Sequence, residues 1–206
     1  DYGNAAFDCP GHQGGQFFRK HPSGRRFFLY FGETLFRADS CNADVRLGDL
    51  LIHEGPAYAA QAHAAKVYNA DKTYFVLNGT SAANKVCINA LVAHGDLVLF
   101  DRNNHKSVHQ GALTMSGGIP VYMQTARNAY GLIGGIPAAD FDEQSIRARI
   151  REVAPERADE ARPFRLAVIQ LGTYDGTIYN ARQVLDRIGH LCDYILFDSA
   201  WVGYEQ

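Results

Sequence analysis

Three short segments of this chain carry side chains that could bind a small charged molecule. The first, Phe75-Val-Leu-Asn-Gly-Thr-Ser81, is an apolar run that ends in Gly-Thr-Ser, where a helical pattern begins. Backbone N–H groups, hydroxyls and the helix dipole favour an anion at such a helix start. The other two are Asp101–Ser107, which contains His105, and Phe197–Trp201, which contains Asp198. A phosphate site, a flat imidazole ring and a carboxylate together indicate a phosphorylated aromatic cofactor.

Gly79, Thr80 and Ser81 are the candidate phosphate ligands. They also fit a simple Ser/Thr helix cap, which is the commoner explanation of so short a motif. Neither Gly-x-x-x-x-Gly-Lys-Ser/Thr nor Gly-x-Gly-x-x-Gly occurs in the chain, which disfavours the common nucleotide-binding loops. A nucleotide-binding module that holds another phosphate stays open as a distant alternative.

His105 and Asp198 are the candidate catalytic residues. The ring of His105 could stack on an aromatic cofactor, and an ionised Asp198 could pair with a protonated pyridine nitrogen. The competing interpretations are a surface or capping histidine and a turn aspartate. His105 and His109 have the i, i+4 spacing of a metal pair, but no convincing third ligand accompanies them, so we expect no metal.

The composition is that of one globular domain. Of the 206 residues, 47% are hydrophobic and 20% are charged, which supports a sizeable core. The net charge is −2 without a long block of one sign, and no apolar run approaches the ~20 residues of a membrane span. We therefore expect neither a nucleic acid nor a membrane partner. Four scattered cysteines without a Cys-x-x-Cys motif predict reduced thiols in a cytoplasmic protein.

Apolar runs and helical periodicities alternate along the chain. The expected strands are residues 73–77, 97–100, 119–123, 166–171 and 194–197, and the expected helices begin near residues 56, 81, 108, 140 and 180. Because the strands are continuous apolar runs, we expect an α/β fold, a mostly parallel sheet with helices on both faces. Ligands of such sheets bind beyond the carboxyl ends of the strands. The candidate segments follow predicted strands and are therefore expected at one edge.

The pattern also predicts several details of the helices. Cys87 is expected on the apolar face of the helix that begins at Ser81. Asp140 with Glu143 resembles a capping box, and Asn180 is expected to cap the last helix. Residues 1–55 show weak periodicity, and we interpret them as a linker or entrance segment that leads into a domain formed by residues 56–206.

Five motifs, in this order, resemble the bacterial ornithine/lysine/arginine decarboxylases. They are Asn78–Lys85, Asp101–Ser107, Arg127–Gly135, Thr173–Gly176 and Phe197–Trp201. The resemblance extends over essentially the whole chain. It is strongest to the ornithine branch, because Asn104 stands where lysine and arginine relatives often carry Cys, and because Leu171–Asn180 is typical of that branch.

This resemblance implies a truncated large domain of the aspartate-aminotransferase-like, pyridoxal-phosphate-dependent type. It assigns the phosphate of the cofactor to Thr80 and Ser81, with close approach at Gly79. It implies that His105 stacks on the pyridine ring and that Asp198 binds the ring nitrogen. The other pocket residues that it implies are Ala200 and Trp201, and the segment Pro10–Gly15 is expected near the substrate entrance.

The resemblance further implies a lyase of polyamine biosynthesis that converts L-ornithine to putrescine and carbon dioxide. Its substrate would be a basic amino acid, and the protein would be a cytoplasmic homo-oligomer, a dimer or larger. A lysine or arginine decarboxylase of the same family stays open, as does a non-catalytic cofactor-binding α/β module. The Schiff-base lysine of the family lies in a Ser-x-His-Lys segment downstream of the Asp198 motif. The chain ends at Gln206 before such a segment, so we expect it to be inactive by itself.

Overall fold

The computed structural model describes residues 9–39, 41, 48 and 53–203. The chain divides into two compact units, Asp1–Phe75 and Val76–Gln206. The predicted division at residue 55 separates an entrance segment from a cofactor domain and stays a prediction. Gln206, where the expected fragment ends, lies outside the described residues.

Within its described residues the first unit contains four helical segments, and the weak periodicity of residues 1–55 does not predict the first three of them. They are η1 (Gln16–Lys20), α1 (Pro22–Phe31), α2 (Glu33–Ala38) and α3 (Gly55–Val67). Pro22 suits the first turn of α1, and the imidazole of His21 accepts from Ser23 N. The buried rings of Phe28 and Phe36 stack with their centroids 5.4 Å apart. Aromatic packing therefore holds α1 and α2 together. No regular apolar periodicity predicts these two helices.

Helix α3 begins as Pro56 predicts, but the strand expected at residues 73–77 is wrong. Residues 72–76 have no regular secondary structure, and Gln61 Oε1 accepts from the backbone N–H of Phe75 at 3.1 Å. A short apolar run has strand propensity, but it does not supply the neighbouring strand that its backbone groups need. Here a buried glutamine side chain satisfies one of those groups instead.

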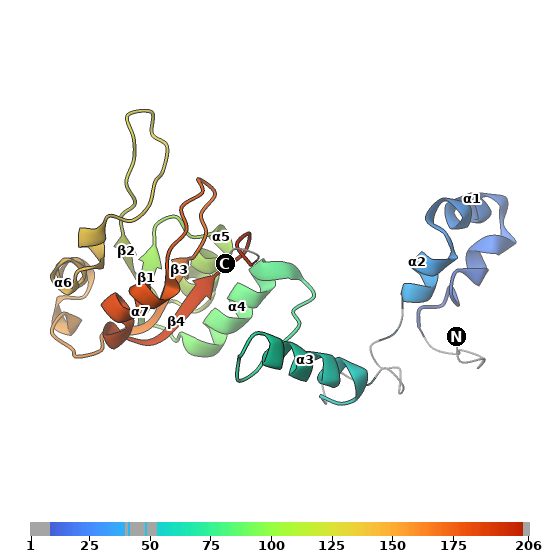
Figure 1. Ribbon diagram of the computed structural model, residues 1–206, viewed down its shortest axis with the longest axis horizontal. Helices are drawn as coiled ribbons and strands as arrows, with labels where there is room; N and C mark the ends of the chain where they lie inside the picture. Colours follow the sequence, from blue (N-terminus) through green and yellow to red (C-terminus); the bar gives the residue numbers. More distant parts are fainter. Residues whose placement is uncertain (1–8, 40, 42–47, 49–52, 204–206) are drawn as a thin grey trace. The chain divides into compact units, whose positions relative to one another are not determined.

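The second unit is built on a four-stranded parallel sheet (Figure 1). Its strands are β1 (Leu97–Asp101), β2 (Ile119–Met123), β3 (Phe164–Gln170) and β4 (Cys192–Asp198), in the order β2-β1-β3-β4. All three neighbouring pairs are parallel, and Gln170 is in register with Asp198. The α/β class and the parallel sheet expected from the apolar runs are confirmed.

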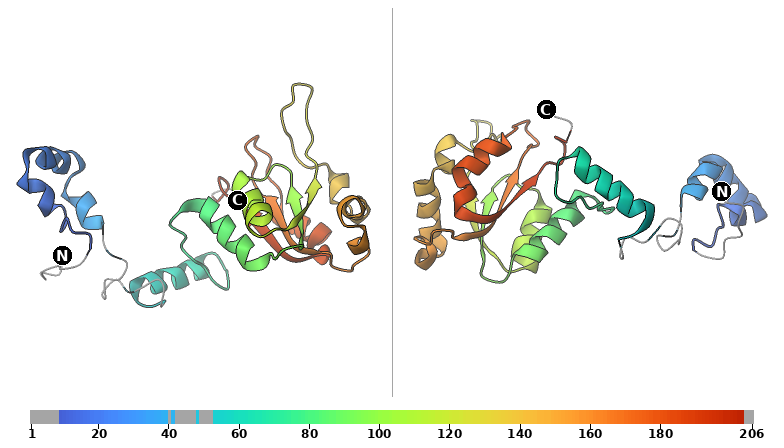
Figure 2. Two further views of the ribbon diagram at one scale, coloured as in Figure 1. Left: turned by 180° about the vertical axis from the view of Figure 1, so that it is seen from behind. Right: turned by 60° about the horizontal axis from the view of Figure 1, so that its bottom comes forward.

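Helices cover both faces of this sheet (Figure 2). One face packs on α4 (Gly79–Leu91), α5 (Lys106–His109) and the π-helical segment η2 (Gln110–Met115). The opposite face packs on α6 (Glu143–Val153) and α7 (Ala181–Ile188). Short 3-10 segments are η3 (Ala138–Phe141), η4 (Pro155–Arg157) and η5 (Gly189–Leu191). Strand β1 serves both layers, since Val98 contacts the first and Leu99 the second.

Helix α4 is turned differently from the sequence-based expectation. The side chains on its buried face are Asn84 and Ile88, followed by Val92 just beyond its end, whereas Cys87 is exposed. The expectation failed because it followed apolar positions alone, whereas the buried face includes the polar residue Asn84. Asn84 is 4% exposed, and its side chain is hydrogen-bonded inside the protein.

The caps of α6 and α7 differ in outcome. Asn180 Oδ1 accepts from Gln183 N at 3.1 Å, which confirms the predicted cap of α7. The capping box at α6 is wrong, because Asp142 occupies the N-cap position. Asp140 instead accepts from Gln124 N and from Arg149 Nη2, at 3.1 and 2.9 Å. Asp140 therefore pairs with a side chain of α6 and does not cap the helix.

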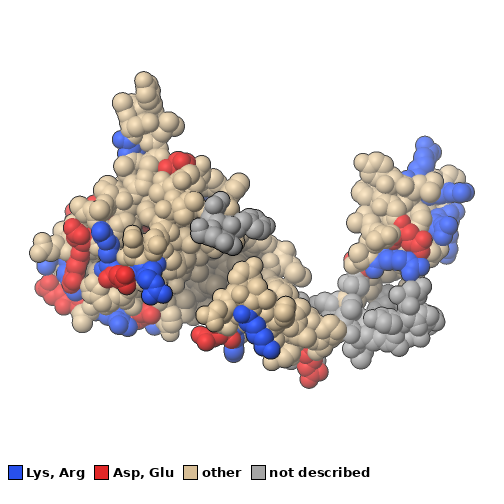
Figure 3. Space-filling model, viewed as in Figure 1, with Lys and Arg blue, Asp and Glu red and all other residues tan. Residues whose placement is uncertain are grey.

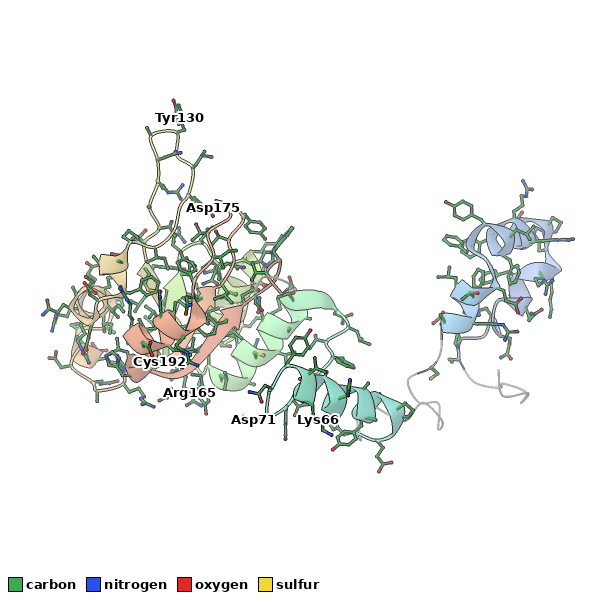
Figure 4. All side chains as sticks on the ribbon, in the orientation of Figure 1. Lys66, Asp71, Tyr130, Arg165, Asp175 and Cys192 are labelled. Carbon is green, nitrogen blue, oxygen red and sulfur yellow. The ribbon has the colours of Figure 1, made fainter. Side chains whose placement is uncertain are left out.

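The loops that follow the strands meet at one edge of the sheet. The loop of residues 124–136 follows β2 and carries Tyr130 near its tip, and Asp175 lies in the loop after β3 (Figure 4). An antiparallel bridge between Arg127 and Ile133 holds the longer loop as a narrow hairpin. Loops after β1 and β4 complete the edge, where parallel-sheet proteins place their sites.

Charged side chains of both signs are interspersed over α6 and its surroundings (Figure 3). Arg147 Nε lies 2.7 Å from Glu143 Oε1, and His190 Nε2 lies 3.0 Å from Glu143 Oε2. Exposed pairs of this kind contribute little to stability. Within the described residues no helix is long and apolar enough to cross a membrane.

Candidate functional site

A cavity of about 500 Å³ opens at the carboxyl edge of the sheet. Its lining residues are Asn78, Gly79, Thr80, Ser81, His105, Gln170, Tyr174, Asp198, Ala200 and Trp201. All seven site residues expected from the sequence are therefore brought together, from the start of α4 and the ends of β1 and β4. Their spatial proximity is a structural finding, whereas their roles stay predictions.

The start of α4 forms one wall of the cavity. Gly79 has φ of 76°, a left-handed conformation that glycine adopts without the steric cost paid by other residues. A Cβ built there meets no atom within 4 Å in the described structure. The side chain of Asn78, the N-cap residue, makes no capping bond within this part of the chain. The first turn of α4 therefore lines the cavity without a capping bond from its N-cap side chain, which leaves its N–H groups available to an anion.

Asp198 supplies the negative charge of the site. Its side chain is 3% exposed, yet it lines the cavity. Oδ2 accepts from Asn84 Nδ2 at 2.9 Å, and Oδ1 accepts from the backbone N–H of Ala200 at 3.1 Å. Each carboxylate oxygen has capacity for a second donor. Asp198 is thus held in place while it can still accept a hydrogen bond from a ligand.

His105 both caps a helix and lines the cavity, so it fits the two interpretations that the sequence leaves open. Its side chain caps α5, because Nδ1 accepts from the backbone N–H of Ser107 at 3.2 Å. The same nitrogen lies 2.8 Å from Ser107 Oγ. The ring also lines the cavity. The cap fixes the orientation of the ring, and the ring remains available to a flat ligand.

Tyr174 and Trp201 lie at the rim of the cavity. Their ring centroids are 5.7 Å apart in an edge-to-face arrangement, and both side chains are exposed. Trp201 also has a left-handed backbone, with φ of 78°, which is uncommon for a bulky residue. The sole tryptophan of the chain therefore belongs to the site region rather than to the core.

Sequence reasoning missed Gln170 and named Tyr174 only as part of the segment Thr173–Gly176. Gln170 Nε2 donates to Gly172 O at 2.9 Å, while its buried Oε1 has no partner within the described residues. That oxygen is an unsatisfied acceptor on a residue that lines the cavity. Gln170 directly follows the apolar run Leu166–Ile169 at the end of β3, and a polar residue in that place was the signal that could have revealed it.

Asp101 is a second buried carboxyl near the site. It is fully buried, and burial raises its pKa from 3.8 to about 6. Oδ1 accepts from Asn103 N at 2.9 Å, whereas Oδ2 has no partner in the described part of the chain. Asn103 Nδ2 in turn donates to Asp175 Oδ1 at 3.2 Å. The group therefore supports the loop that leads to His105, outside the lining of the cavity.

His105 and His109 lie in different surroundings. The described residues contain no cluster of three or more His, Cys, Asp or Glu side chains that could hold a metal ion. The ring of His109 packs against Phe100 and Tyr122, with centroid distances of 5.2 and 5.8 Å. Burial lowers the pKa of His109. His109 is thus a packing residue, and only His105 lines the cavity.

The segment Pro10–Gly15 belongs to the first unit, where it precedes η1. His12 Nδ1 accepts from Gly15 N at 3.1 Å, and His12 Nε2 lies 3.0 Å from Asp39 Oδ2. These contacts make the segment an ordered turn. Its expected place near a substrate entrance stays a prediction.

Known proteins resemble this chain over its whole length. The family model described as "Orn/Lys/Arg decarboxylase, major domain" matches residues 1–206. An inducible ornithine decarboxylase of Escherichia coli is 76% identical over 204 residues, which are 99% of this chain and 28% of that protein. A lysine decarboxylase of Pseudomonas aeruginosa is 42% identical over 98% of this chain and 26% of its own length.

The fold has a solved counterpart as well. The lysine decarboxylase of Francisella novicida superposes with a TM-score of 0.87 at 38% identity, covering 98% of this chain and 27% of that one. The chain thus spans between a quarter and a third of the length of the relatives it matches. The family match extends over every residue, and this chain belongs to the Orn/Lys/Arg decarboxylase major-domain family.

Proposed function

We propose that the protein containing this chain is a pyridoxal-phosphate-dependent decarboxylase that converts L-ornithine to putrescine and carbon dioxide. The observation that carries the proposal is the cavity itself. It joins an uncapped helix start, a histidine ring and a buried carboxylate, which are Gly79–Ser81, His105 and Asp198. Membership of the decarboxylase family supports the reaction class.

The residues present fit this cofactor. A phosphate needs donors, which the first turn of α4 supplies together with the hydroxyls of Thr80 and Ser81. The open space at the Cα of Gly79 lets a bulky anion approach the backbone. A protonated ring nitrogen needs an acceptor, which Asp198 supplies from a buried position. The partnerless Oε1 of Gln170 offers a further acceptor in the same cavity.

Each residue then has a definite task. When bound, the cofactor supplies an electron sink for the electrons left after carbon dioxide departs. Asp198 keeps the proton on the ring nitrogen by offering it a carboxylate oxygen. His105 limits tilting of the ring, because its imidazole is held by Ser107. Thr80 and Ser81, which line the cavity, would hold the phosphate of the cofactor.

Ornithine is the substrate favoured by similarity. The relative at 76% identity is named for ornithine, whereas the lysine decarboxylase is 42% identical over a comparable stretch. The reaction belongs to polyamine biosynthesis, and its product is putrescine. We propose a cytoplasmic homo-oligomer, a dimer or larger; the free thiols of Cys9, Cys87 and Cys192 are consistent with a reducing compartment.

The experiment is an absorbance spectrum of the full-length protein purified with pyridoxal phosphate, before and after addition of L-ornithine, with L-lysine and L-arginine as parallel substrates. A cofactor band that changes with ornithine, together with release of putrescine and carbon dioxide, supports the proposal. Turnover of lysine or arginine alone would reassign the substrate. A protein that binds ATP or NAD and shows no cofactor band would be a nucleotide-binding module, and the proposal would be wrong.

A further inference from the structure

Asn84 joins the buried carboxylate to the histidine of the site. Its Nδ2 donates to Asp198 Oδ2 at 2.9 Å and to Ser107 Oγ at 3.3 Å. Ser107 Oγ lies 2.8 Å from His105 Nδ1. Asn84 and Ser107 are 4% and 2% exposed. A continuous hydrogen-bonded chain therefore runs from Asp198 through two buried side chains to His105.

One backbone group determines the direction of every hydrogen bond in the series that runs from Asp198 to His105. The N–H of Ser107 can only donate, and it points at His105 Nδ1. Nδ1 is therefore an acceptor without a proton, so the hydroxyl of Ser107 also donates to it. The lone pairs of that hydroxyl are then left to accept from Asn84. One amide hydrogen of Asn84 serves Ser107 and the other serves Asp198, which leaves a single consistent arrangement.

We propose that Asn84 is a positioning residue, which holds Asp198 and His105 in one fixed arrangement around the ring of the bound cofactor. The inference rests on the proposed function. Asn84 is not among the residues that line the cavity, so it acts through its two partners. Neither the helical pattern of α4 nor the family resemblance assigned it a role.

The physical reason is that the amide of Asn84 restrains both the carboxylate of Asp198 and, through Ser107, the ring of His105. Without Asn84, the Oδ2 of Asp198 loses its only protein donor among the described residues, and a buried acceptor without a partner is costly. The hydroxyl of Ser107 also becomes free to rotate away from His105. Both groups then have to be ordered when the cofactor binds, and ordering at that moment weakens binding. Preorganised polar groups are also what a charged reaction centre needs.

The test uses the full-length protein in five forms: wild type, Asn84→Ala, Ser107→Ala, the double variant of these two, and the control Asn89→Ala. Asn89 lies on the same helix but is exposed, and its side chain bonds to Lys85 O and Ser116. The measurements are the Kd for pyridoxal phosphate, the visible circular dichroism of the bound cofactor, kcat and KM for ornithine, and the thermal midpoint of the cofactor-free protein.

We expect Asn84→Ala to bind pyridoxal phosphate about tenfold more weakly, to lose much of the cofactor's visible circular dichroism, and to lower kcat more than it raises KM. Ser107→Ala should lose less, about threefold in Kd, because Asp198 keeps its donor. Asn89→Ala should match wild type. In a double-mutant cycle, the effects of Asn84→Ala and Ser107→Ala should fall short of additivity, because the two residues act in one chain.

The possible outcomes distinguish a failure of this inference from a failure of the proposed function on which it rests. If Asn84→Ala lowers only the thermal midpoint and leaves cofactor binding, circular dichroism and kcat as in Asn89→Ala, Asn84 is a packing residue and the inference fails. Should Asn84→Ala not fold, Ser107→Ala decides: wild-type values for all cofactor readouts would overturn the inference. A wild-type protein without a cofactor band or turnover would instead overturn the proposed function.

Discussion

The side chain of Asn104 donates a hydrogen bond of 2.8 Å from Nδ2 to the carbonyl oxygen of Val168, on the neighbouring strand β3. The same nitrogen donates to Asp101 O at 2.9 Å. The loop that carries His105 is thereby fastened to two adjacent strands by a single buried amide. Asn104 thus has a structural task beside the site.

Asn104→Ala should destabilise the protein by about 1–3 kcal/mol, because the buried carbonyl oxygen of Val168 loses its side-chain donor. Asn103→Ala is the matched control, since the adjacent Asn103 side chain bonds to the exposed Asp175 and should cost less than about 0.5 kcal/mol. Chemical unfolding of the two variants beside wild type measures the difference. Equal losses would show that the Asn104 bonds contribute nothing.

Asp198→Asn should reduce kcat on the order of a hundredfold, because the amide cannot supply the negative charge that holds the proton on a ring nitrogen. The fold should lose about 1–3 kcal/mol, since the amide oxygen can accept only one of the two hydrogen bonds and the amide nitrogen then faces a donor. Asp193→Asn is the control on the same strand; its carboxylate pairs with Arg165 at the surface. Near-normal turnover of Asp198→Asn in the full-length protein would remove Asp198 from the reaction.

Gly79→Ala should weaken the binding of pyridoxal phosphate by about tenfold or more, because the added methyl group projects into the open space beside the anion site. The left-handed backbone adds about 1 kcal/mol of destabilisation. Gly131→Ala is matched to it, since Gly131 has φ of 80° and equally open surroundings on the hairpin. The two variants should lose similar stability, and only Gly79→Ala should lose cofactor affinity. A titration of both that gave the same Kd would place the phosphate elsewhere.

Asp101 should make stability depend on pH. Burial raises its pKa from 3.8 to about 6, so the folded protein holds this proton more tightly than the unfolded chain. The resulting stabilisation is present below about pH 4 and is lost as pH rises through about 6, amounting to roughly 3 kcal/mol. Asp101→Asn lacks this dependence. The variant should therefore gain stability relative to wild type between pH 4.5 and 7.5, as unfolding curves at the two pH values can measure. A constant difference would mean that Asp101 titrates normally.

The strands, their parallel arrangement and the gathering of the site were predictable from local sequence. Runs such as Leu97–Phe100 are apolar throughout because the strand is covered on both faces. Such a run can be recognised in the sequence without knowing which strands lie beside it. The polar residues that follow, from Asp101 to His105, then have to lie at the carboxyl edge. The Gly-Thr-Ser composition of residues 79–81 predicted the start of α4. The parallel topology brings these segments together, so their order in the chain sufficed.

The apolar run at residues 73–77 and the amphipathic face of α4 were misread for one reason. Periodicity reports the polarity of a side chain, but not the partner that it meets. Phe75 finds the side chain of Gln61 rather than a neighbouring strand. On α4, the less polar Cys87 is exposed and the polar Asn84 is buried, which is the reverse of what their polarity predicts.

Tertiary structure alone decided which polar residues support the site. Asn84 and Asp198 are 114 positions apart, yet one hydrogen bond of 2.9 Å joins them. A buried asparagine is stable only where both of its amide hydrogens find acceptors, and the acceptors here come from α5 and β4. The sequence by itself determined the fold class, the family and seven of the residues that line the cavity. The chain of bonds that holds those residues arises only when distant segments pack, because a hydrogen bond depends on position in space and not on spacing along the chain.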